Sequence, residues 1–258
     1  MTLQRAGGAA AFSDSAPAYA ETMAPALRPV AVEVVRRAAL QPGERVLDVG
    51  TGTGTASAMA AGDGRRVIGL DAAAGMLELA RREVAGVDFV HADFSDMPME
   101  DRAFDVVIAV HALLFADDRV AALREWLRVS DRGGRLSLSV PGPEAVVPNT
   151  LFGPVYDRYG ITWGNDYPTA NELAEWAEEA GWGSIQTSAD PTIGIELADD
   201  AHFRTWLSVG ARGRATAGWS DERREQLGRD LMDAARRAGH AGFRLPFGAL
   251  YLTARRPA

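Results

Sequence analysis

The sequence contains no cysteine, which excludes disulfide bonds, thiolate nucleophiles and thiolate metal ligands. It also contains no lysine, so all 27 basic residues are arginine. Together with the many alanines, this composition indicates the coding bias of a GC-rich genome rather than a functional choice. The absence of cysteine fits a reducing compartment, and the expected location is the cytoplasm.

Long apolar runs and an excess of positive charge are absent as well. No stretch approaches the roughly 18 apolar residues of a membrane-spanning helix, so no membrane association is expected. The first twenty residues lack the apolar core of a secretory signal peptide. The net charge of −8 disfavours nucleic acid as a partner, because a phosphate backbone binds a basic surface.

The most informative stretch that is present covers residues 46–54, Val-Leu-Asp-Val-Gly-Thr-Gly-Thr-Gly. Its apolar start predicts a short buried strand. Its glycines are Gly50, Gly52 and Gly54. They predict a tight turn against a ligand, since a Cβ would block that approach. A dinucleotide fingerprint has its third glycine where this chain has Thr55, and an acid such as Asp48 before the turn favours a ligand with an ammonium group over a pyrophosphate.

Strand and helix patterns alternate along the first 140 residues. Apolar segments predict strands at 46–50, 67–71, 87–90, 104–110 and 135–140, with helices between them. The α/β alternation predicts a doubly wound, Rossmann-like and mostly parallel sheet, with its ligand site at the carboxyl ends of the strands. Two further strands near 184–188 and 243–253 complete a seven-stranded sheet, and the helices around them form cap insertions.

The pattern Asp-x-Gly-x-Gly-x-Gly resembles the first motif of class I S-adenosylmethionine (SAM) dependent methyltransferases, in which the glycine turn lies under the methionine and ribose of SAM. Residues 67–77 resemble the second motif of that family, and residues 89–107 resemble the third motif and the fourth strand. The resemblance covers residues 44–140 and is nearest to the ubiquinone and menaquinone type of small-molecule methyltransferase. It implies SAM as cofactor, S-adenosylhomocysteine (SAH) as product and a small organic acceptor.

The resemblance also suggests cofactor contacts. Asp71, at the end of the second strand, would accept the ribose hydroxyls, and Asp93, at the end of the third, would accept the adenine amino group. The alternatives are a helix-capping acid at Asp71 and a solvated turn acid at Asp93. Tyr19 lies in an N-terminal helix of the kind that folds over SAM. The expected cofactor-binding residues are Tyr19, Asp48, Gly50, Thr51, Gly52, Gly54, Asp71, Ala72, Met76, Ala92, Asp93, Phe94 and Val110.

His111 directly follows the fourth strand, where the family places the transferred methyl group. Histidine accepts a proton near neutral pH, so His111 is the candidate catalytic base for methylation of a hydroxyl, a phenol or an acidic carbon. The alternative role is a hydrogen bond to the backbone that shapes the pocket. Asp117 and Asp118 are explained more simply as helix caps than as metal ligands, and no metal site is expected.

One domain is expected over residues 1–258, with a helical lid at 1–40, the cofactor-binding core at 41–140 and substrate-cap insertions at 141–168 and 195–240. Aromatic residues gather in and next to these insertions, where they fit a pocket for a neutral or apolar acceptor as well as they fit an ordinary core. They are the aromatics of 152–167, which are Phe152, Tyr156, Tyr159, Trp163 and Tyr167, together with Trp206, Phe243 and Phe247. A homodimer is left open.

Three other functions are alternatives to methyl transfer. A protein of this kind can bind SAM and use its sulfonium charge for another reaction, such as a cyclisation. A nicotinamide oxidoreductase is disfavoured by Asp48, by the missing third glycine and by the lack of lysine for a Tyr-x-x-x-Lys pair. A non-catalytic binding module is disfavoured by the intact cofactor motifs.

Overall fold

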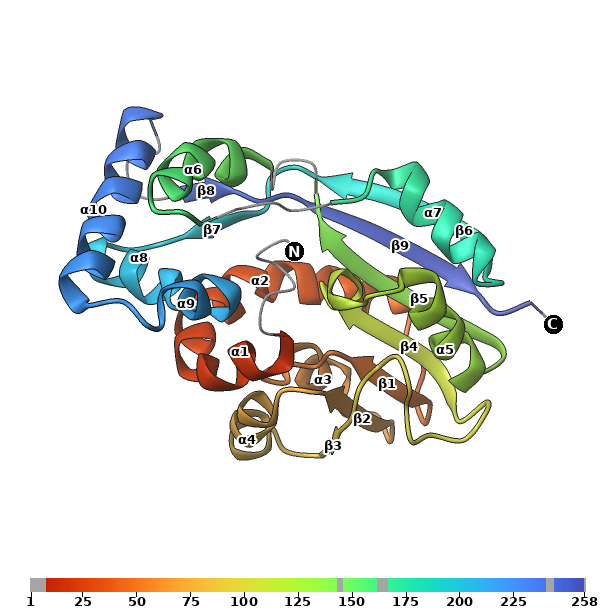
Figure 1. Cartoon of the computed structure of the whole chain (residues 1–258). Helices are drawn as coiled ribbons and strands as arrows, with labels where there is room; N and C mark the ends of the chain where they lie inside the picture. The colour runs from red at the N-terminus through yellow and green to blue at the C-terminus, as the bar shows by residue number, and fades with distance from the viewer. Residues whose placement is uncertain (1–7, 143–145, 162–166, 240–243, 258) are drawn as a thin grey trace.

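The structure is a computed structural model that describes residues 8–142, 146–161, 167–239 and 244–257. A seven-stranded sheet runs through it in the order β3-β2-β1-β4-β5-β9-β6 (Figure 1). Its strands are β1 (Arg45–Val49), β2 (Arg66–Asp71), β3 (Val87–His91), β4 (Phe104–Val110), β5 (Ser130–Pro141), β6 (Gly183–Asp190) and β9 (Ala249–Arg255). The first five strands pair in parallel, and β9 runs antiparallel to β5 and β6. The predicted mostly parallel, doubly wound sheet is confirmed.

Helices cover both faces of this sheet, because successive strand residues point to opposite sides. Val46 of β1 and Val106 of β4 belong to the buried cluster beneath α2 (Ala16–Ala38) and α3 (Thr55–Ala60). Their neighbours Leu47 and Val107 belong to a second cluster with α5 (Arg119–Val129) and α7 (Ala170–Glu179). A strand buried on both faces needs nearly continuous apolar sequence, and β4 has it in Phe-Asp-Val-Val-Ile-Ala-Val.

Two helix starts follow the capping signals of the sequence. The Asp118 carboxylate accepts a hydrogen bond from the backbone N–H of Ala121 at 2.9 Å, at the start of α5. Thr169 and Glu172 form a reciprocal capping box at the start of α7. The helix-cap interpretation of Asp118 is therefore confirmed, and α4 (Ala74–Glu83) likewise forms within the predicted range.

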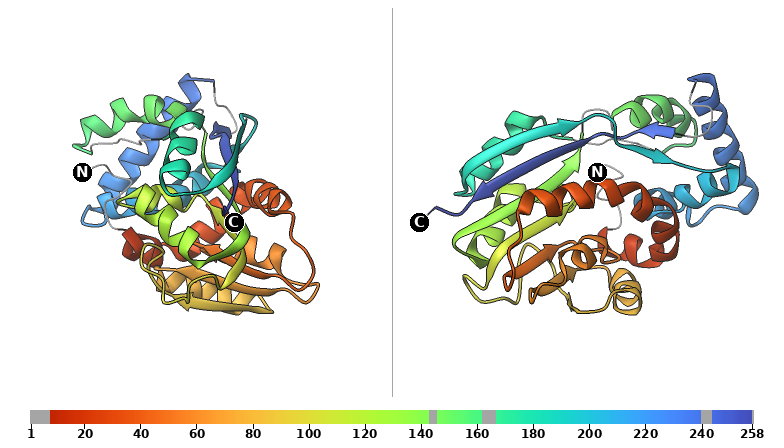
Figure 2. Two further views of the ribbon diagram at one scale, coloured as in Figure 1. Left: turned by 90° about the vertical axis from the view of Figure 1, so that its right-hand side faces the viewer. Right: turned by 180° about the vertical axis from the view of Figure 1, so that it is seen from behind.

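A second group of helices, the helical cap, lies beyond the carboxyl ends of β4 and β5 (Figures 1 and 2). It comprises α6 (Val146–Arg158), α8 (Asp200–Leu207), α9 (Gly210–Thr216) and α10 (Asp221–Arg237). A small antiparallel sheet of β7 (Gly194–Glu196) and β8 (Arg244–Pro246) accompanies it. The single strand predicted over 243–253 is therefore two strands, β8 and β9, which are separated by Phe247 and Gly248. Phe243 lies outside the described residues.

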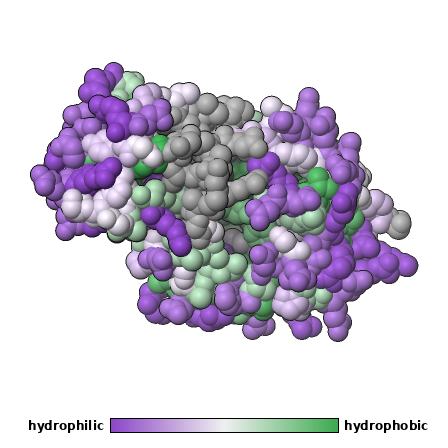
Figure 3. Space-filling view, viewed as in Figure 1, coloured by the Kyte–Doolittle hydropathy of each residue, from purple (hydrophilic) through white to green (hydrophobic). Residues whose placement is uncertain are grey.

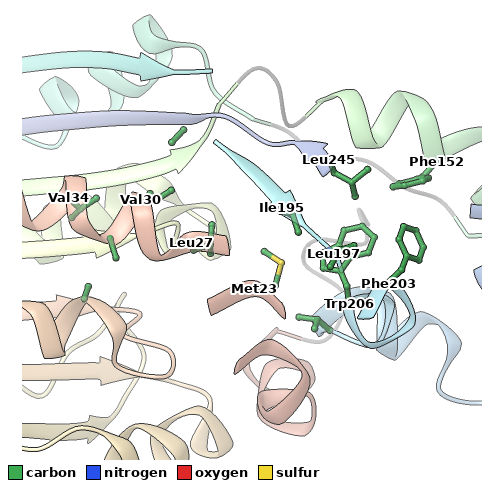
Figure 4. Close-up of a cluster of buried hydrophobic side chains, with 14 of the residues drawn as sticks. Met23, Leu27, Val30, Val34, Phe152, Ile195, Leu197, Phe203, Trp206 and Leu245 are labelled. Carbon is green, nitrogen blue, oxygen red and sulfur yellow. The ribbon is translucent and has the colours of Figure 1, made fainter. Parts of the chain in front are cut away.

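Aromatic side chains form the interior of the helical cap (Figure 4). Phe152 of α6 meets Phe203 and Trp206 of α8 at ring-centroid distances of 6.0 and 6.1 Å. Met23 of α2 belongs to the same buried cluster, so the cap and the main domain share one core. Such pairs contribute about 0.5–1.5 kcal/mol each beyond the area that they bury.

The N-terminal helix α1 (Gly8–Asp14) precedes α2 within the predicted lid at 1–40, and tertiary contacts hold it. The Ser13 hydroxyl accepts a hydrogen bond from the N–H of Gly75 in α4 at 2.7 Å. The Ser15 hydroxyl, at the junction with α2, accepts one from Gly210 in α9 at 2.9 Å. The α1–α2 junction therefore bridges the main domain and the helical cap.

The surface on the side of Figure 3 is mainly hydrophilic around its grey atoms. Among the described residues, Val32 and Phe115 are the large hydrophobic side chains that are exposed. No helix in the described ranges has both the length and the hydropathy to cross a membrane.

Candidate active site

The glycine turn connects β1 to α3 at the carboxyl edge of the sheet. Gly50, Gly52 and Gly54 all adopt positive φ, at +66°, +55° and +83°. Gly50 is also confined by its neighbours, because a Cβ placed on it would lie 2.5 Å from the Cβ of Ala112, just beyond β4. The predicted tight turn is present, and it brings the ends of β1 and β4 into close approach.

Asp48 lies beneath this turn and is only 1% exposed. Its Oδ2 accepts hydrogen bonds from the hydroxyls of Thr51, at 2.8 Å, and Ser57, at 2.7 Å. Burial raises the pKa of this carboxyl to about 6, against the opposing effect of the two hydroxyls. Asp48 thus holds the turn in place and adds negative charge close to any ligand that lies on it.

Asp71 links the end of β2 to the same turn. Its Oδ2 accepts a hydrogen bond from the N–H of Gly52, and its Oδ1 accepts one from Ala73, both at 2.8 Å. Each carboxylate oxygen has a second lone pair, so two further donors, such as a vicinal diol, can be bound. Burial raises the pKa of the Asp71 carboxyl, while these backbone N–H groups lower it.

Tyr19 of α2 covers the turn from above. Its Cε1 would be 4.0 Å from a Cβ placed on Gly52. Burial and the negative charges of Asp71 and Asp48 raise the pKa of the Tyr19 hydroxyl. A pocket of about 30 Å³ remains, lined by Tyr19, Ala24, Leu27, Ala31, Asp48, Gly50, Thr51, Thr53, Thr55, Ala56 and Val110. The volume is about that of one water molecule in the liquid, so α2 closes this part of the site.

The residues expected around adenine lie at the neighbouring strand ends. The N–H of Ala92 donates to the Asp71 carbonyl at 3.1 Å, and the Ala72 carbonyl is 2.9 Å from His91 Nε2. Met76 is 1% exposed and packs with Ala16 and Ala73, near the rings of Phe12 and Tyr19. These contacts place the ends of β2 and β3 side by side, as the predicted topology requires.

Asp93 and Phe94 differ in how firmly they are held. Asp93 is exposed, and its Oδ1 accepts a hydrogen bond from the N–H of Ser95 at 2.7 Å. Phe94 packs edge-on against Trp126 at 6.0 Å, and its carbonyl accepts a hydrogen bond from the Trp126 indole. Neither residue lines the small pocket beneath Tyr19.

His111 follows β4 in an unusual backbone conformation, with φ at +56°. Its N–H donates to the Ser139 carbonyl at 3.0 Å, and its Nδ1 lies 3.1 Å from the Ser139 hydroxyl on β5. The side chain is 7% exposed, and its Nε2 has no hydrogen-bond partner among the described residues. Burial lowers the pKa of the imidazole to about 4, so the ring is neutral at pH 7.

Sequence reasoning missed the hydroxyl partners of these groups. Ser57 and Ser139 contact Asp48 and His111, and neither serine belongs to a recognisable motif. The one available signal was indirect: a buried acid or imidazole requires a hydrogen-bond partner. Within the described ranges, no three histidine, aspartate or glutamate side chains cluster closely enough to hold a metal ion.

Comparison with known proteins identifies the family. A model described as a methyltransferase domain matches residues 47–138. A demethylmenaquinone methyltransferase from Clavibacter sepedonicus is 34% identical over 176 residues, which is 60% of this chain and 72% of that protein. The chain is a class I SAM-dependent methyltransferase. The match includes the glycine turn and the ends of β2, β3 and β4, where the candidate cofactor residues of this methyltransferase lie.

Solved structures support the fold of the methyltransferase over most of its length. A putative methyltransferase from Bacillus halodurans superimposes with a TM-score of 0.59 at 20% identity, covering 88% of this chain and 99% of that one. The cyclase SpnF superimposes with a TM-score of 0.58 at 23% identity, covering 90% and 81%. At these identities the likeness concerns the fold alone, so it does not decide between reactions.

The residues of the site fit SAM. Gly52 carries no Cβ that would enter the space beneath Tyr19. The free lone pairs of Asp71 suit a ribose diol, and the buried Asp48 carboxyl suits a ligand that carries positive charge.

Proposed function

We propose that this methyltransferase transfers the methyl group of SAM to an oxygen, carbon or nitrogen atom of a small organic acceptor with an apolar body. The observation that carries the proposal is the position of His111. It follows β4 beside Val110 and Ala112, which face the glycine turn, and its buried Nε2 has no partner in the described part of the chain. A neutral imidazole is thus held at the strand end next to the expected methyl donor.

The proposed cofactor contacts divide by position. Asp71 would bind the ribose hydroxyls, Asp93 would accept the adenine amino group, and Tyr19 would close over the methionine end. Asp48 would fix the turn through Thr51. Backbone and apolar side chains would form the remaining walls, at Gly50, Gly52, Gly54, Ala72, Met76, Ala92, Phe94 and Val110.

SAM supplies an activated methyl group on a sulfonium, so the protein's main task is to align the acceptor atom with it. Positioning of this kind can contribute roughly 7–11 kcal/mol. His111 would add to this where the acceptor must lose a proton. In that role Nδ1–H would donate to the Ser139 hydroxyl, and the lone pair on Nε2 would take the acceptor proton while the methyl group passes from sulfur to the acceptor and SAH is left.

The apolar cap supports the acceptor part of the proposal. The ring of Phe247 lies 5.6 Å from that of His111, and Phe247 packs against the hydrophobic cluster that the main domain and the helical cap share. The proposed functional parts of the chain are a lid at 1–40, a cofactor-binding core at 41–140 and substrate-cap insertions at 141–168 and 195–240. The cytoplasmic location, the homodimer and the lack of nucleic-acid partners stay predictions from the sequence.

Calorimetric titration of SAH and SAM into the purified protein tests the cofactor part, and we expect both to bind. Incubation with labelled SAM and a panel of phenols, hydroxy acids and amines tests the transfer. A product heavier than its acceptor by one CH₂ unit supports methylation. A product without that mass increase, formed only when SAM is present, supports a cyclisation or another rearrangement instead. Absence of SAH and SAM binding contradicts the whole proposal.

A further inference from the structure

A cavity of about 830 Å³ lies between the α1–α2 junction and the helical cap. Its described lining comes from six helices and the turns next to them: Ala11, Asp14, Ser15, Pro17, Ala18, Tyr156, Arg204, Leu207, Ser208, Gly210, Arg212, Gly213, Arg214, Thr216, Ala217, Asp221, Arg224, Glu225 and Leu227. Ala18 lines this cavity while the next residue, Tyr19, lines the small pocket over the glycine turn. The two spaces therefore share the first turn of α2 as a wall. The volume is within the range of small-molecule sites.

Arg212 is the distinctive residue of this cavity. Its guanidinium lies 4.0 Å from the centroid of the Trp206 ring, and its Nε donates to the Trp206 carbonyl at 3.2 Å. The side chain is half-buried, and burial lowers the pKa of the guanidinium. The groups that offset this are the hydroxyls of Tyr156 and Tyr167. No carboxylate of the described residues forms an ion pair with Arg212.

Several other partly buried arginines form ion pairs, whereas Arg256 donates to the carbonyls of Leu127 and Ser130. Arg45 contacts Asp105 and Asp131, each at 2.7 Å. Arg128 contacts Glu125 and Asp101 at the same distance. A cation withdrawn from water without a counter-ion is costly, and the cost is offset when an anion binds to it. Arg212 differs from Arg45 and Arg128 in forming no ion pair with a described carboxylate, and it lines a cavity.

The Trp206 ring on which Arg212 stacks carries a buried donor, although Trp206 does not itself line the cavity. Trp206 is 3% exposed, and its indole N–H has no hydrogen-bond partner within the described residues. The indole can only donate, so what it lacks is an acceptor. Phe247 packs against the same large hydrophobic cluster that contains Trp206, and its ring lies 5.6 Å from that of His111.

The net charge of the residues that line the cavity limits the charge that a bound ligand can carry. Its described lining includes four arginines and three carboxylates, which leaves one positive charge. Arg224 is paired with Asp221, whereas Arg204 and Arg214 are exposed to solvent. A single enclosed guanidinium matches the planar, singly charged carboxylate, and the dianionic form of a phosphate would exceed the available charge.

We propose that this cavity binds an acceptor that combines an apolar body with one carboxylate group, and that Arg212 holds the carboxylate. The assignment of the ligand as the acceptor rests on the proposed methyltransferase function, whereas binding of a carboxylate to the cavity does not. The expected acceptor is thereby narrowed from neutral or apolar molecules to apolar monocarboxylates.

Calorimetry with pairs of isosteric probes tests the proposal: phenylacetate against phenylacetamide, and octanoate against octanamide, with inorganic phosphate as a third arm. We expect the acids to bind the wild-type protein at least about tenfold more tightly than the amides. Arg212→Gln should remove that preference, and Arg212→Lys should retain part of it, because lysine keeps the charge and loses the planar fork. Equal binding of acids and amides, or unchanged preference in Arg212→Gln, overturns the proposal.

Arg223→Gln is the matched control. Arg223 stacks on Trp219 at 3.9 Å, much as Arg212 stacks on Trp206, but it is exposed and does not line the cavity. Its loss should leave the acid preference unchanged. SAH is titrated into every variant in parallel: unchanged SAH affinity in Arg212→Gln shows that the variant is folded. Binding of phosphate but of neither acid also overturns the proposal, whereas failure of SAH to bind the wild type overturns the proposed function alone.

Discussion

The glycine turn and the helical cap present different kinds of surface: one is mostly backbone and the other is mostly side chains. At the glycine turn, backbone groups form most of the surface, and Asp71 is fixed by two backbone N–H groups. In the helical cap, side chains form the surface: aromatic rings, a buried indole and the guanidinium of Arg212. A backbone surface changes little when side chains are substituted, whereas a side-chain surface changes with each one. Under the proposed function, the cofactor would be bound by the conformation of the turn, and the choice of acceptor would depend on the identity of cap residues.

The largest effect on ligand binding and stability is expected from a substitution at Gly50, in the backbone surface of the glycine turn. Gly50→Ala adds a Cβ that would lie 2.5 Å from Ala112 and imposes a side chain on a positive φ. We expect loss of SAH binding in calorimetry and a fall in unfolding free energy of roughly 2–5 kcal/mol by urea denaturation. Gly133→Ala is the control, since Gly133 also has positive φ but open space around it. Equal behaviour of the two variants would show that contact with Ala112 is unimportant.

His111 follows β4 between the glycine turn and Phe247. His111→Asn is the most suitable variant, because asparagine tolerates positive φ. If the imidazole is the base, turnover should fall about 10²–10⁴-fold while SAH affinity stays unchanged. Ser139→Ala should have a smaller effect, since it removes only the hydroxyl that orients the ring. Retention of wild-type turnover in His111→Asn would leave His111 with the pocket-shaping role.

A substitution at Asp71 tests how the glycine-turn side of the site binds the cofactor. Asp71→Asn keeps the shape of the side chain, loses the charge and replaces one acceptor oxygen by a donor. SAH affinity measured by calorimetry should fall roughly 10–100-fold, the range for a charged hydrogen bond. Asp93→Asn should cost less, because Asp93 is exposed. The proposed ribose contact is contradicted if Asp71→Asn binds SAH as tightly as the wild type does.

The smallest effect concerns pH. The pKa of His111 is about 4 in the folded protein and near 6.5 when the chain is unfolded, so the unfolded state binds the proton first as the pH falls. The folded state therefore loses stability between pH 6.5 and 4. Relative to His111→Asn, the wild type should lose about 2 kcal/mol of unfolding free energy between pH 7 and pH 5. The comparison of the two proteins cancels the opposite effect of Asp48, whose pKa is raised to about 6.

The cofactor end could be predicted because its signals are local. The apolar run of β1, the three glycines and the acids at successive strand ends lie close together in the sequence, and parallel pairing brings them to one edge. The contacts of His111 could not be predicted. Ser139 is 28 residues away and reaches His111 only through the register that pairs Val110 with Ser139.

The cap was less predictable for the same reason. β7 and β8 pair although about fifty residues separate them, and each has only three residues. Helix α1 depends on hydrogen bonds to Gly75 and Gly210, which lie in distant parts of the chain. The unpaired state of Arg212 is a property of its surroundings and leaves no trace in the residues next to it. Long-range packing overrides local propensity in each of these places.

The central claim is that cofactor binding and acceptor binding reside in separate parts of one site. Calorimetric titration of SAH into the wild type, Asp71→Asn and Arg212→Gln tests it most directly. The account predicts tight binding to the wild type, at least about tenfold weaker binding to Asp71→Asn, and wild-type affinity in Arg212→Gln. Absence of SAH binding to the wild type, or equal weakening in both variants, would contradict it.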